Sequence, residues 1–207
     1  FHQLSISKNE LVKILQIGVP AGLQGTVFSL SNVVIQSSLN SFGSSVIAGS
    51  SAAVNFEYIG FAIVNGFSQA ATTFVGQNYG AKEYKRCRKV WKLALTTGIG
   101  IAFVMDVLIV LLRVPFVHFF TSDMKVIPYA AQRVLQVMSL HWLIGTYEIT
   151  GSALRGYGKS IAPALLTVFG TCVVRLVWVY FVNNFFHTYT MLLLVYPVSW
   201  AITGALV

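Results

Sequence analysis

Several ionisable side chains interrupt otherwise apolar stretches of this sequence: Glu57, Asp106, Glu148 and Arg175. If these stretches cross a bilayer, a charge within one costs roughly 3 kcal/mol or more, and an ionisable residue there is a functional hypothesis. A carboxylate in a partly dry site can bind and release a proton near physiological pH, or exchange that proton for a cation. Glu148 and Glu57 are therefore the leading candidates for ion binding.

The helical rise of about 1.5 Å per residue gives the depth of each charge. Glu57 lies about 16 Å from the outer end of its stretch, and Glu148 lies about 10 Å from the inner end of its own, so their depths are similar. Arg175 is nearer the outside, and its long side chain could reach either carboxylate. A static ion pair with Arg175, or a hydrogen bond to an amide, is the alternative to ion exchange. For Asp106 we expect a pair with Arg113, about two turns away.

Other polar groups extend this chemistry. His141, Gly145 and Glu148 follow at i, i+4 and i+7, so His141 shares a helix face with Glu148. A proton relay and a purely structural histidine are the two interpretations of His141. Tyr58 and Tyr147 could offer aromatic faces to a bound cation.

The sequence carries no recognisable catalytic motif. Cys87 lies in a basic segment and Cys172 in an apolar run, without the spacing of a disulfide framework or a metal site. We therefore expect no enzyme, no metal site and no cofactor beyond a coupling ion. An intramembrane enzyme, whose site need not be a local motif, stays as an alternative.

Small and polar residues recur at spacings of three or four along two apolar stretches, which places each set on one helix face. The first set is Gly18, Gly22, Gly25, Ser29, Asn32, Gln36 and Asn40, and the second is Ser51, Asn55, Tyr58, Ala62, Asn65, Gln69 and Thr72. Unpaired amides are costly in lipid, so both faces must look inward, either for helix packing or around a water-filled cavity. The amides favour the cavity. The predicted substrate- and ion-binding residues are Glu148, Glu57, Arg175, Asn32, Gln36, Asn55, Tyr58, Asn65 and Gln69.

The composition predicts which elements position these side chains. Only 10% of the 207 residues are charged and 56% are hydrophobic, whereas about 25% are charged in an average soluble domain. We predict an all-α, polytopic membrane protein forming one domain over residues 1–207, a fragment of a longer chain because both ends look like cuts. Six transmembrane helices are expected at about 14–39, 46–75, 90–112, 129–154, 161–182 and 189–207.

The positive charge is concentrated in one segment. Six of the 14 lysines and arginines lie between Lys82 and Lys92, opposed by Glu83 alone. A cluster at one segment argues against nucleic-acid binding and is typical of a cytoplasmic loop. We therefore expect a multi-pass protein of the plasma (inner) membrane, with the N-terminal end and the segment from Lys82 to Lys92 in the cytoplasm.

Four motifs are similar to those of the multidrug and toxic compound extrusion (MATE) transporter family. They are GVPAGLQ from Gly18, VGQNYGAK from Val75, LRGYGKS from Leu154 followed by Pro163, and YPVSW from Tyr196. The resemblance covers nearly the whole chain. It implies one six-helix lobe of a twelve-helix transporter, and YPVSW together with Arg175 points to the C-terminal lobe.

The resemblance implies a proton- or sodium-driven antiporter that exports cationic amphipathic drugs by alternating access. Its partners would be the lipid bilayer, small cationic substrates and the missing N-terminal lobe. Several members carry an acidic residue in the first helix of this lobe, but the matching stretch here, Gly25 to Phe28, has no carboxylate. The coupling ion therefore stays open between H⁺ and Na⁺. Glu148 matches a glutamate of bacterial members.

Two further alternatives remain. A lipid-linked precursor flippase of the same superfamily would favour a basic cavity, and Arg175 is the deep basic residue that we identify. A permease or channel subunit complete at six spans would have no second, homologous lobe.

Overall fold

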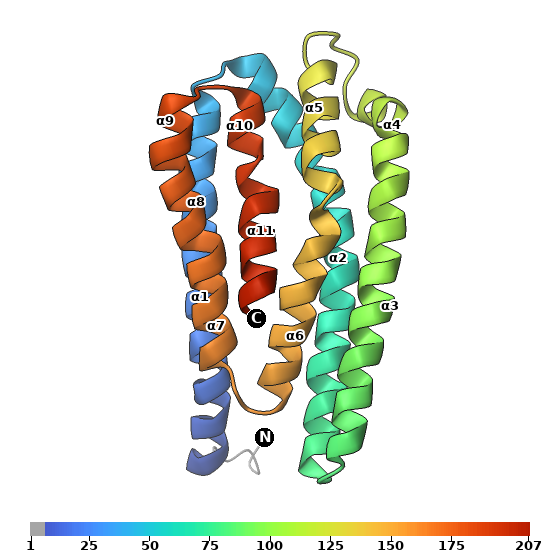
Figure 1. Cartoon of the computed structure of the whole chain (residues 1–207), viewed down its shortest axis with the longest axis vertical. Coiled ribbons are helices and arrows are strands. Elements are labelled where there is room, and N and C mark those ends of the chain that lie inside the picture. The colour runs from blue at the N-terminus through green and yellow to red at the C-terminus, as the bar shows by residue number, and fades with distance from the viewer. Residues whose placement is uncertain (1–6) are drawn as a thin grey trace, which may run out of the picture.

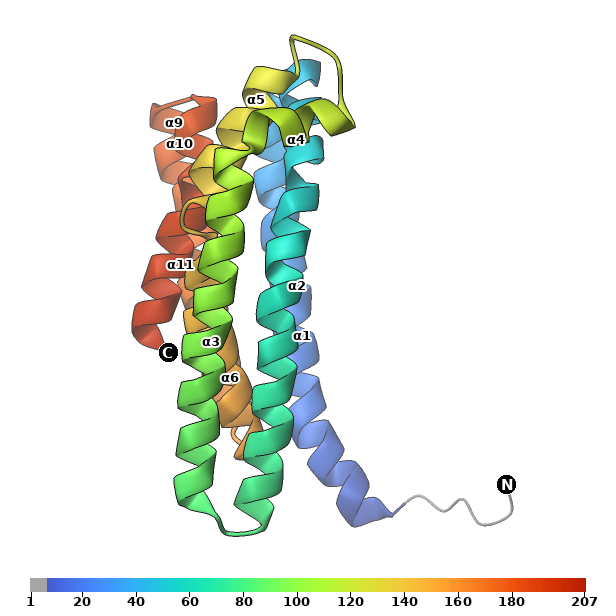
Figure 2. The ribbon, with the colours of Figure 1, turned by 90° about the vertical axis from the view of Figure 1, so that its right-hand side faces the viewer.

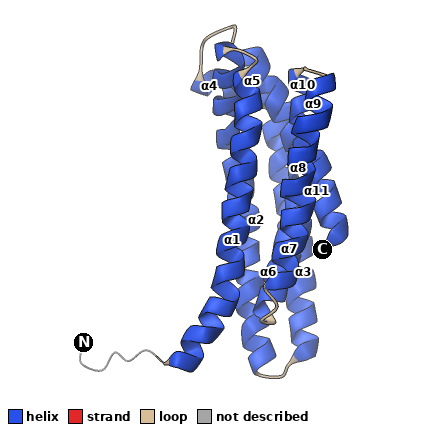
Figure 3. Ribbon diagram, turned by 90° about the vertical axis from the view of Figure 1, so that its left-hand side faces the viewer, coloured by secondary structure: helices blue, strands red, loops and turns tan. Residues whose placement is uncertain are grey.

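Long antiparallel helices dominate the structure, a computed structural model that describes residues 7–207. Figure 1 shows α1 (Lys8–Asn40), α2 (Ser44–Gly80) and α3 (Tyr84–Leu111) running along the length of the molecule. The short α4 (Arg113–Phe120) turns across the end of the bundle (Figure 2). Every regular element among residues 7–207 is a helix, so the predicted all-α class is confirmed (Figure 3). Residues 1–6 of the predicted domain lie outside the described part.

The fourth expected span is not one continuous helix. It consists of α5 (Ile127–Arg133), the π-helix η1 (Val134–Met138), the 3₁₀ turn η2 (His141–Leu143) and α6 (Ile144–Gly156). The break falls at Ser139 and Leu140, and Leu140 has φ −123° and ψ 10°, outside the helical region. The span expected at about 129–154 therefore consists of several helical pieces instead of one continuous helix. Hydropathy measures how apolar a stretch is, and it does not detect such a local break.

The last two expected spans are built from short consecutive helical pieces. The first comprises α7 (Ile161–Thr167), the π-helix η3 (Val168–Val173), α8 (Val174–Val177), the π-helix η4 (Trp178–Val182) and α9 (Asn183–Phe185). The second comprises α10 (Tyr189–Leu193) and α11 (Val195–Leu206). Among residues 7–207, five helical runs are long and apolar enough to cross a membrane: Lys8–Asn40, Ser44–Gly80, Tyr84–Leu111, Ile161–Val182 and Tyr189–Leu206.

Several helices extend beyond their apolar spans. α3 begins at Tyr84, so most of the basic residues expected in a loop lie in its first turns instead. Lysine and arginine are good helix formers, and a helix can therefore continue past the membrane edge that hydropathy detects. The turn before α3 contains Lys82 at φ 62°, the left-handed conformation that commonly ends a helix. Near the N-terminus, Pro20 lies inside α1. The N-terminal part of this helix bends away from the bundle (Figure 2).

The helices form two groups. α2 packs against α3, α5 and α6, while α1 and α11 pack against the pieces of the fifth span. Figure 1 shows α1 and α7–α9 on one side, α2 and α3 on the other, and α11 between them. Glycines permit the closest approaches. A Cβ at Gly156 would lie 2.8 Å from the Thr72 carbonyl oxygen and 3.1 Å from the Gly76 nitrogen, both backbone atoms of α2.

Gly156→Ala should therefore destabilise the bundle by about 1–3 kcal/mol, because the added methyl group meets a backbone that cannot rotate away. Gly100→Ala is the matched control, since a Cβ at that position of α3 has nothing within 4 Å. Thermal unfolding in detergent should show a lower midpoint for Gly156→Ala and no decrease for Gly100→Ala. Equal midpoints would contradict the α2–α6 packing.

Candidate functional site

A cavity of about 680 Å³ lies between the two helix groups. Its walls come from α1, α2, the broken fourth span, the fifth span and α11. The polar and aromatic lining residues are Gln24, Phe28, Asn32, Gln36, Glu57, Tyr58, Phe61, Gln69, Thr72, Arg133, His141, Tyr147, Glu148, Ser152, Arg155, Thr167, Arg175, Tyr196 and Trp200. The cavity thus combines charged groups with aromatic faces, which suits an amphipathic ligand.

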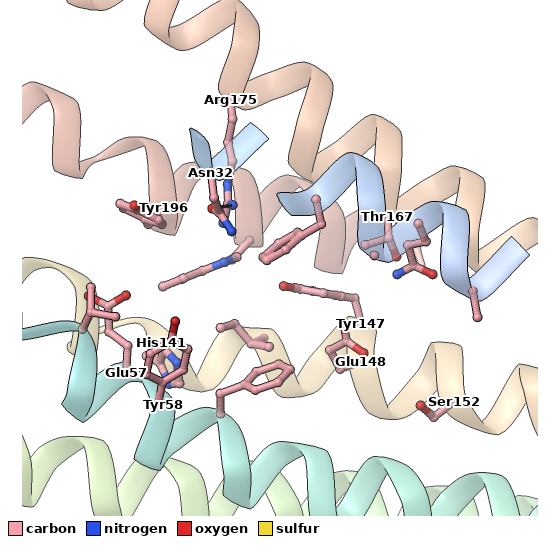
Figure 4. A pocket seen from close by; sticks show the side chains of 18 of the residues that line it. Asn32, Glu57, Tyr58, His141, Tyr147, Glu148, Ser152, Thr167, Arg175 and Tyr196 are labelled. Carbon is pink, nitrogen blue, oxygen red and sulfur yellow. Dashed lines mark hydrogen bonds between the residues drawn. The ribbon is translucent and has the colours of Figure 1, made fainter. Parts of the chain in front are cut away.

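Glu148 projects into this cavity from α6 (Figure 4). Its carboxylate takes part in none of the ion pairs or side-chain hydrogen bonds among residues 7–207. Arg155, one of the nearby charges, instead donates to Gln24 Oε1 at 2.9 Å and Ser152 Oγ at 3.1 Å. The alternative of a static pair between Glu148 and Arg175 is therefore wrong. A carboxylate without a fixed partner, at the wall of a cavity, is free to bind a proton or a cation.

Glu57 has a fixed partner that the sequence analysis overlooked. Arg133 Nε donates to Glu57 Oε1 at 2.7 Å and its Nη2 donates to Oε2 at 3.1 Å, a two-pronged ion pair. The side chains are 4% and 16% exposed, Arg133 being the more buried. The alternative of a static ion pair thus applies to Glu57, but its partner is Arg133 and not Arg175. Arg133 could have been found, because it lies within the predicted span 129–154.

Arg175 lies on α8 and is 1% exposed. Its Nη1 donates to Asn32 Oδ1 at 2.8 Å and its Nε donates to Ser199 Oγ at 3.3 Å. The guanidinium carbon lies 4.8 Å from the centre of the Phe28 ring and 5.1 Å from that of Tyr196. Neutral oxygens and aromatic faces therefore hold Arg175, and no carboxylate among residues 7–207 pairs with it.

Tyr196 connects the two arginines. The guanidinium carbon of Arg133 lies 5.0 Å from the ring centre of Tyr196, close to the 5.1 Å distance for Arg175. One aromatic ring on α11 thus contacts cations from the fourth and the fifth spans. Arg133 and Arg175 both lie at this end of the cavity, and Glu57 is the carboxylate paired with Arg133 there. Positive charge therefore exceeds negative charge at this end.

Asp106 lies next to a different residue from the one predicted. Its Oδ1 lies 3.5 Å from His141 Nδ1, and the two side chains are 1% and 2% exposed. Arg113, the expected partner, donates instead to the Val110 carbonyl oxygen at 2.8 Å. A Cβ at Gly60 would lie within 3.0 Å of both Asp106 and His141. The absence of a side chain at Gly60 therefore leaves room for these two side chains.

The polar stripes only partly face the cavity. Asn32, Gln36, Tyr58 and Gln69 line it, as the stripe interpretation predicted. Asn55 and Asn65 do not, although both are exposed, and Asn55 donates to the carbonyl oxygens of Ser51 and Ala52 on its own helix. The helix face defined by spacings of three or four is therefore wider than the cavity wall. The lining residues that the sequence did not predict include Gln24, Phe28, Arg133, Arg155 and Thr167.

The described part of the chain contains no group of three or more His, Cys, Asp and Glu residues that could hold a metal ion. Cys87 and Cys172 are both buried and free.

Comparison with known proteins gives consistent matches. A profile of the MatE family matches residues 20–181. The probable multidrug resistance protein YoeA of Bacillus subtilis is 26% identical over 168 residues, and NorM of Thermotoga maritima is 27% identical over 168 residues. These alignments cover 80% and 79% of this chain but 36% and 35% of those proteins. The chain therefore spans about a third of the length of these curated relatives.

Solved structures share the fold. A mutant of the Vibrio cholerae MATE transporter VcmN aligns with a TM-score of 0.86 at 20% identity, over 99% of this chain and 46% of that one. VcmN in the bent form aligns with a TM-score of 0.85 at 20% identity, over 97% of this chain and 46% of that one. The match thus covers nearly all of this chain and about half of each transporter. With the family profile covering most of its residues, the chain belongs to the MatE family and corresponds to one lobe of a MATE transporter.

Proposed function

We propose that this chain is the C-terminal lobe of an ion-coupled antiporter that exports cationic amphipathic drugs. The observation that carries the proposal is Glu148, a carboxylate without an ion-pair partner among residues 7–207, at the wall of a cavity of about 680 Å³. A substrate cation and a proton or Na⁺ would compete for this carboxylate. Protonation removes its charge and weakens the binding of a cation, which couples the two fluxes in opposite directions.

Aromatic side chains would contribute the apolar part of substrate binding. Tyr58 is 68% exposed and Phe61 is 41% exposed, and both line the cavity from α2. The ring face of Tyr58 could carry a cation by a cation–π interaction. Tyr147 lines the cavity beside Glu148 on α6. A flat aromatic cation would therefore meet both a charge and ring surfaces.

The exposed faces of α1 and α2 support a second lobe. Gly18, Gly22 and Gly25 have nothing within 4 Å of a hypothetical Cβ, and Asn55 and Asn65 on α2 are exposed. Exposed amides and bare helix backbone are costly against lipid and are typical of surfaces where helices meet. We infer that the N-terminal lobe of the same protein covers this face and completes the cavity.

Separate expression of the two lobes tests this inference. The chain alone should not export a cationic dye, whereas co-expression with the N-terminal lobe should restore export, because both lobes are needed to close the cavity. Co-expression of the Glu148→Gln chain is the control for a complex that assembles without transport. The measurement for each combination of lobes is dye efflux from cells. Export by this chain alone would contradict the two-lobe proposal.

We further propose that the turn between α2 and α3 lies in the cytoplasm of a plasma-membrane protein, because the positive charges from Lys82 to Lys92 resist translocation. A cysteine at Glu83 should resist an impermeant thiol reagent added outside intact cells, and a cysteine at Ser122 should react. Cys87 and Cys172 are buried, so they add little background. Ready labelling at Glu83 would invert the proposed orientation.

A further inference from the structure

We propose that the outer face of α3 binds an anionic phospholipid, with the phosphate headgroup at the basic first turns of the helix and an acyl chain in an apolar groove further along it. This face lies outside the central cavity, because none of the described residues that line that cavity belongs to α3. Figure 1 shows α3 at the edge of the bundle, on the side of α2 away from α1. The inference does not rest on the proposed drug export.

The headgroup site is a dense cluster of exposed positive charge. Its members, each of them exposed, are Lys82, Lys85, Arg86, Arg88, Lys89 and Lys92. Glu83 is the acidic residue in this segment, and its Oε2 lies 3.9 Å from Arg86 Nε in an ion pair that is open to solvent. Six basic residues against one acidic residue leave five positive charges. Basic clusters of this size beside a membrane-spanning helix attract anionic lipid headgroups, which are abundant in the cytoplasmic leaflet.

An apolar groove of about 530 Å³ lies on the same helix. Its lining residues, none of them charged, are Thr97, Gly100, Ile101, Val104, Met105 and Leu108. Ile101, Val104 and Leu108 are exposed, so residues 7–207 leave the groove uncovered. Because the second lobe is inferred to cover α1 and α2, lipid chains are the neighbours that remain for this part of α3. An acyl chain therefore matches the groove chemically.

The basic cluster and the groove share one face of α3. The residues that connect them recur at spacings of three or four, which defines a helix face: Arg86, Lys89, Leu93, Thr97, Gly100 and Val104. The buried Cys87 and Ala94 lie on a different face. Leu93 is the first exposed apolar residue after the basic turns, and the groove begins at Thr97, about 6 Å further along the helix. One leaflet occupies about 15 Å of the hydrocarbon core, so an acyl chain whose headgroup lies at the basic turns reaches the groove.

Tyrosines mark the depth of the headgroup region at this end of the bundle. The ring centres of Tyr79 and Tyr84 lie 5.8 Å apart, and those of Tyr79 and Tyr157 lie 5.3 Å apart, both in edge-to-face arrangements. Tyrosine is enriched where a membrane meets water, because its ring is apolar and its hydroxyl group is polar. The basic cluster thus lies at headgroup depth. A phosphate that carries acyl chains occupies both the cluster and the groove, whereas a free phosphate occupies the cluster alone.

Lipid binding to the full-length protein in detergent tests the inference. The probe is a fluorescent phosphatidylglycerol, and the comparison is phosphatidylcholine with the same acyl chains and fluorophore. The wild-type protein should bind phosphatidylglycerol at least about tenfold more tightly, because each nearby lysine or arginine adds to the attraction of an anionic headgroup. This preference should diminish as the NaCl concentration rises, since salt screens exposed charges.

The combined variant Arg86→Gln and Lys89→Gln should weaken phosphatidylglycerol binding about tenfold or more and change phosphatidylcholine binding by less than about twofold. If this variant does not accumulate, Lys89→Gln alone should weaken phosphatidylglycerol binding several-fold. The matched control is Lys8→Gln with Lys13→Gln, which removes two exposed charges from α1 and should leave the affinity for phosphatidylglycerol within about twofold. Val104→Trp fills the groove from an exposed position and should weaken the binding of both lipids several-fold without changing their ratio.

Several results would overturn the lipid site. Equal affinities of the wild-type protein for the two lipids would do so, as would phosphatidylglycerol binding that the Arg86 and Lys89 substitutions leave unchanged. An equal loss in the Lys8 and Lys13 control would assign the binding to net charge instead of this face. Competition by glycerol phosphate at the concentrations that phosphatidylglycerol requires would show that a phosphate without acyl chains suffices. Unchanged binding of both lipids by Val104→Trp would contradict the placement of the acyl chain in the groove.

Discussion

Replacing Glu148 with glutamine is expected to abolish ion-driven drug efflux without reducing the amount of protein in the membrane. Glutamine keeps the size and hydrogen-bonding capacity of the side chain but cannot titrate. Because Glu148 makes no ion pair among residues 7–207, its neutralisation leaves no cation unpaired, and the fold should tolerate it. Efflux and protein level, measured in the same cells that express the full-length protein, separate a transport defect from a folding defect.

Two further variants serve as controls for this result. Glu148→Asp keeps the charge and moves it by one methylene, so part of the efflux should remain. Glu83→Gln removes a carboxylate at the α2–α3 turn, where its side chain is 52% exposed, and efflux should be unchanged. Full efflux by Glu148→Gln at normal protein level would exclude Glu148 as the coupling residue.

Removal of either partner of the Glu57–Arg133 ion pair is expected to destabilise the protein by about 3–5 kcal/mol, the range for breaking a buried pair. Glu57→Gln leaves Arg133, with 4% of its side chain exposed, without its acidic partner. The double variant Glu57→Leu and Arg133→Met removes both charges and should recover most of the loss. The measurement is the midpoint of thermal unfolding in detergent, together with the yield of folded protein.

An exposed ion pair provides the matched control. Lys13 and Glu10 lie 2.9 Å apart with side chains 67% and 64% exposed, and Glu10→Gln should have little effect on the unfolding midpoint because solvent screens such pairs. A Glu57→Gln midpoint equal to that of Glu10→Gln would show that the buried pair does not stabilise the bundle. A double variant as unstable as the single one would assign the loss to packing instead of charge.

Much of the architecture could be predicted from the sequence because hydrophobic composition and charge patterning report directly on the membrane environment. The positions of the helices follow from apolar runs of sufficient length, and α1, α2 and α3 coincide with three of them. Their ends differ because charged residues, as at the start of α3, continue a helix beyond the apolar run. The break at Leu140 depends on local backbone geometry, which hydropathy does not encode.

The site was only partly predictable for a related reason. Periodicity identifies a helix face, as for Asn32 and Gln36, but it does not tell which part of that face meets a cavity, as Asn55 and Asn65 show. Pairing between charges requires the relative positions of helices far apart in sequence. Glu57 and Arg133 are 76 positions apart, and no spacing rule connects them. Asp106 was assigned to Arg113 because it is close in sequence, whereas the neighbour of Asp106 is His141 on another element.

The most direct test of ion-coupled antiport is to measure ion movement driven by the drug itself. The full-length protein would be reconstituted in vesicles with a gradient of the cationic dye tetramethylrhodamine methyl ester and no initial H⁺ or Na⁺ gradient. Dye movement, internal pH and internal Na⁺ would then be recorded in parallel. We expect dye movement to drive H⁺ or Na⁺ in the opposite direction and Glu148→Gln to eliminate this counterflow. Dye movement by the wild-type protein without any counterflow of either ion would contradict ion-coupled antiport.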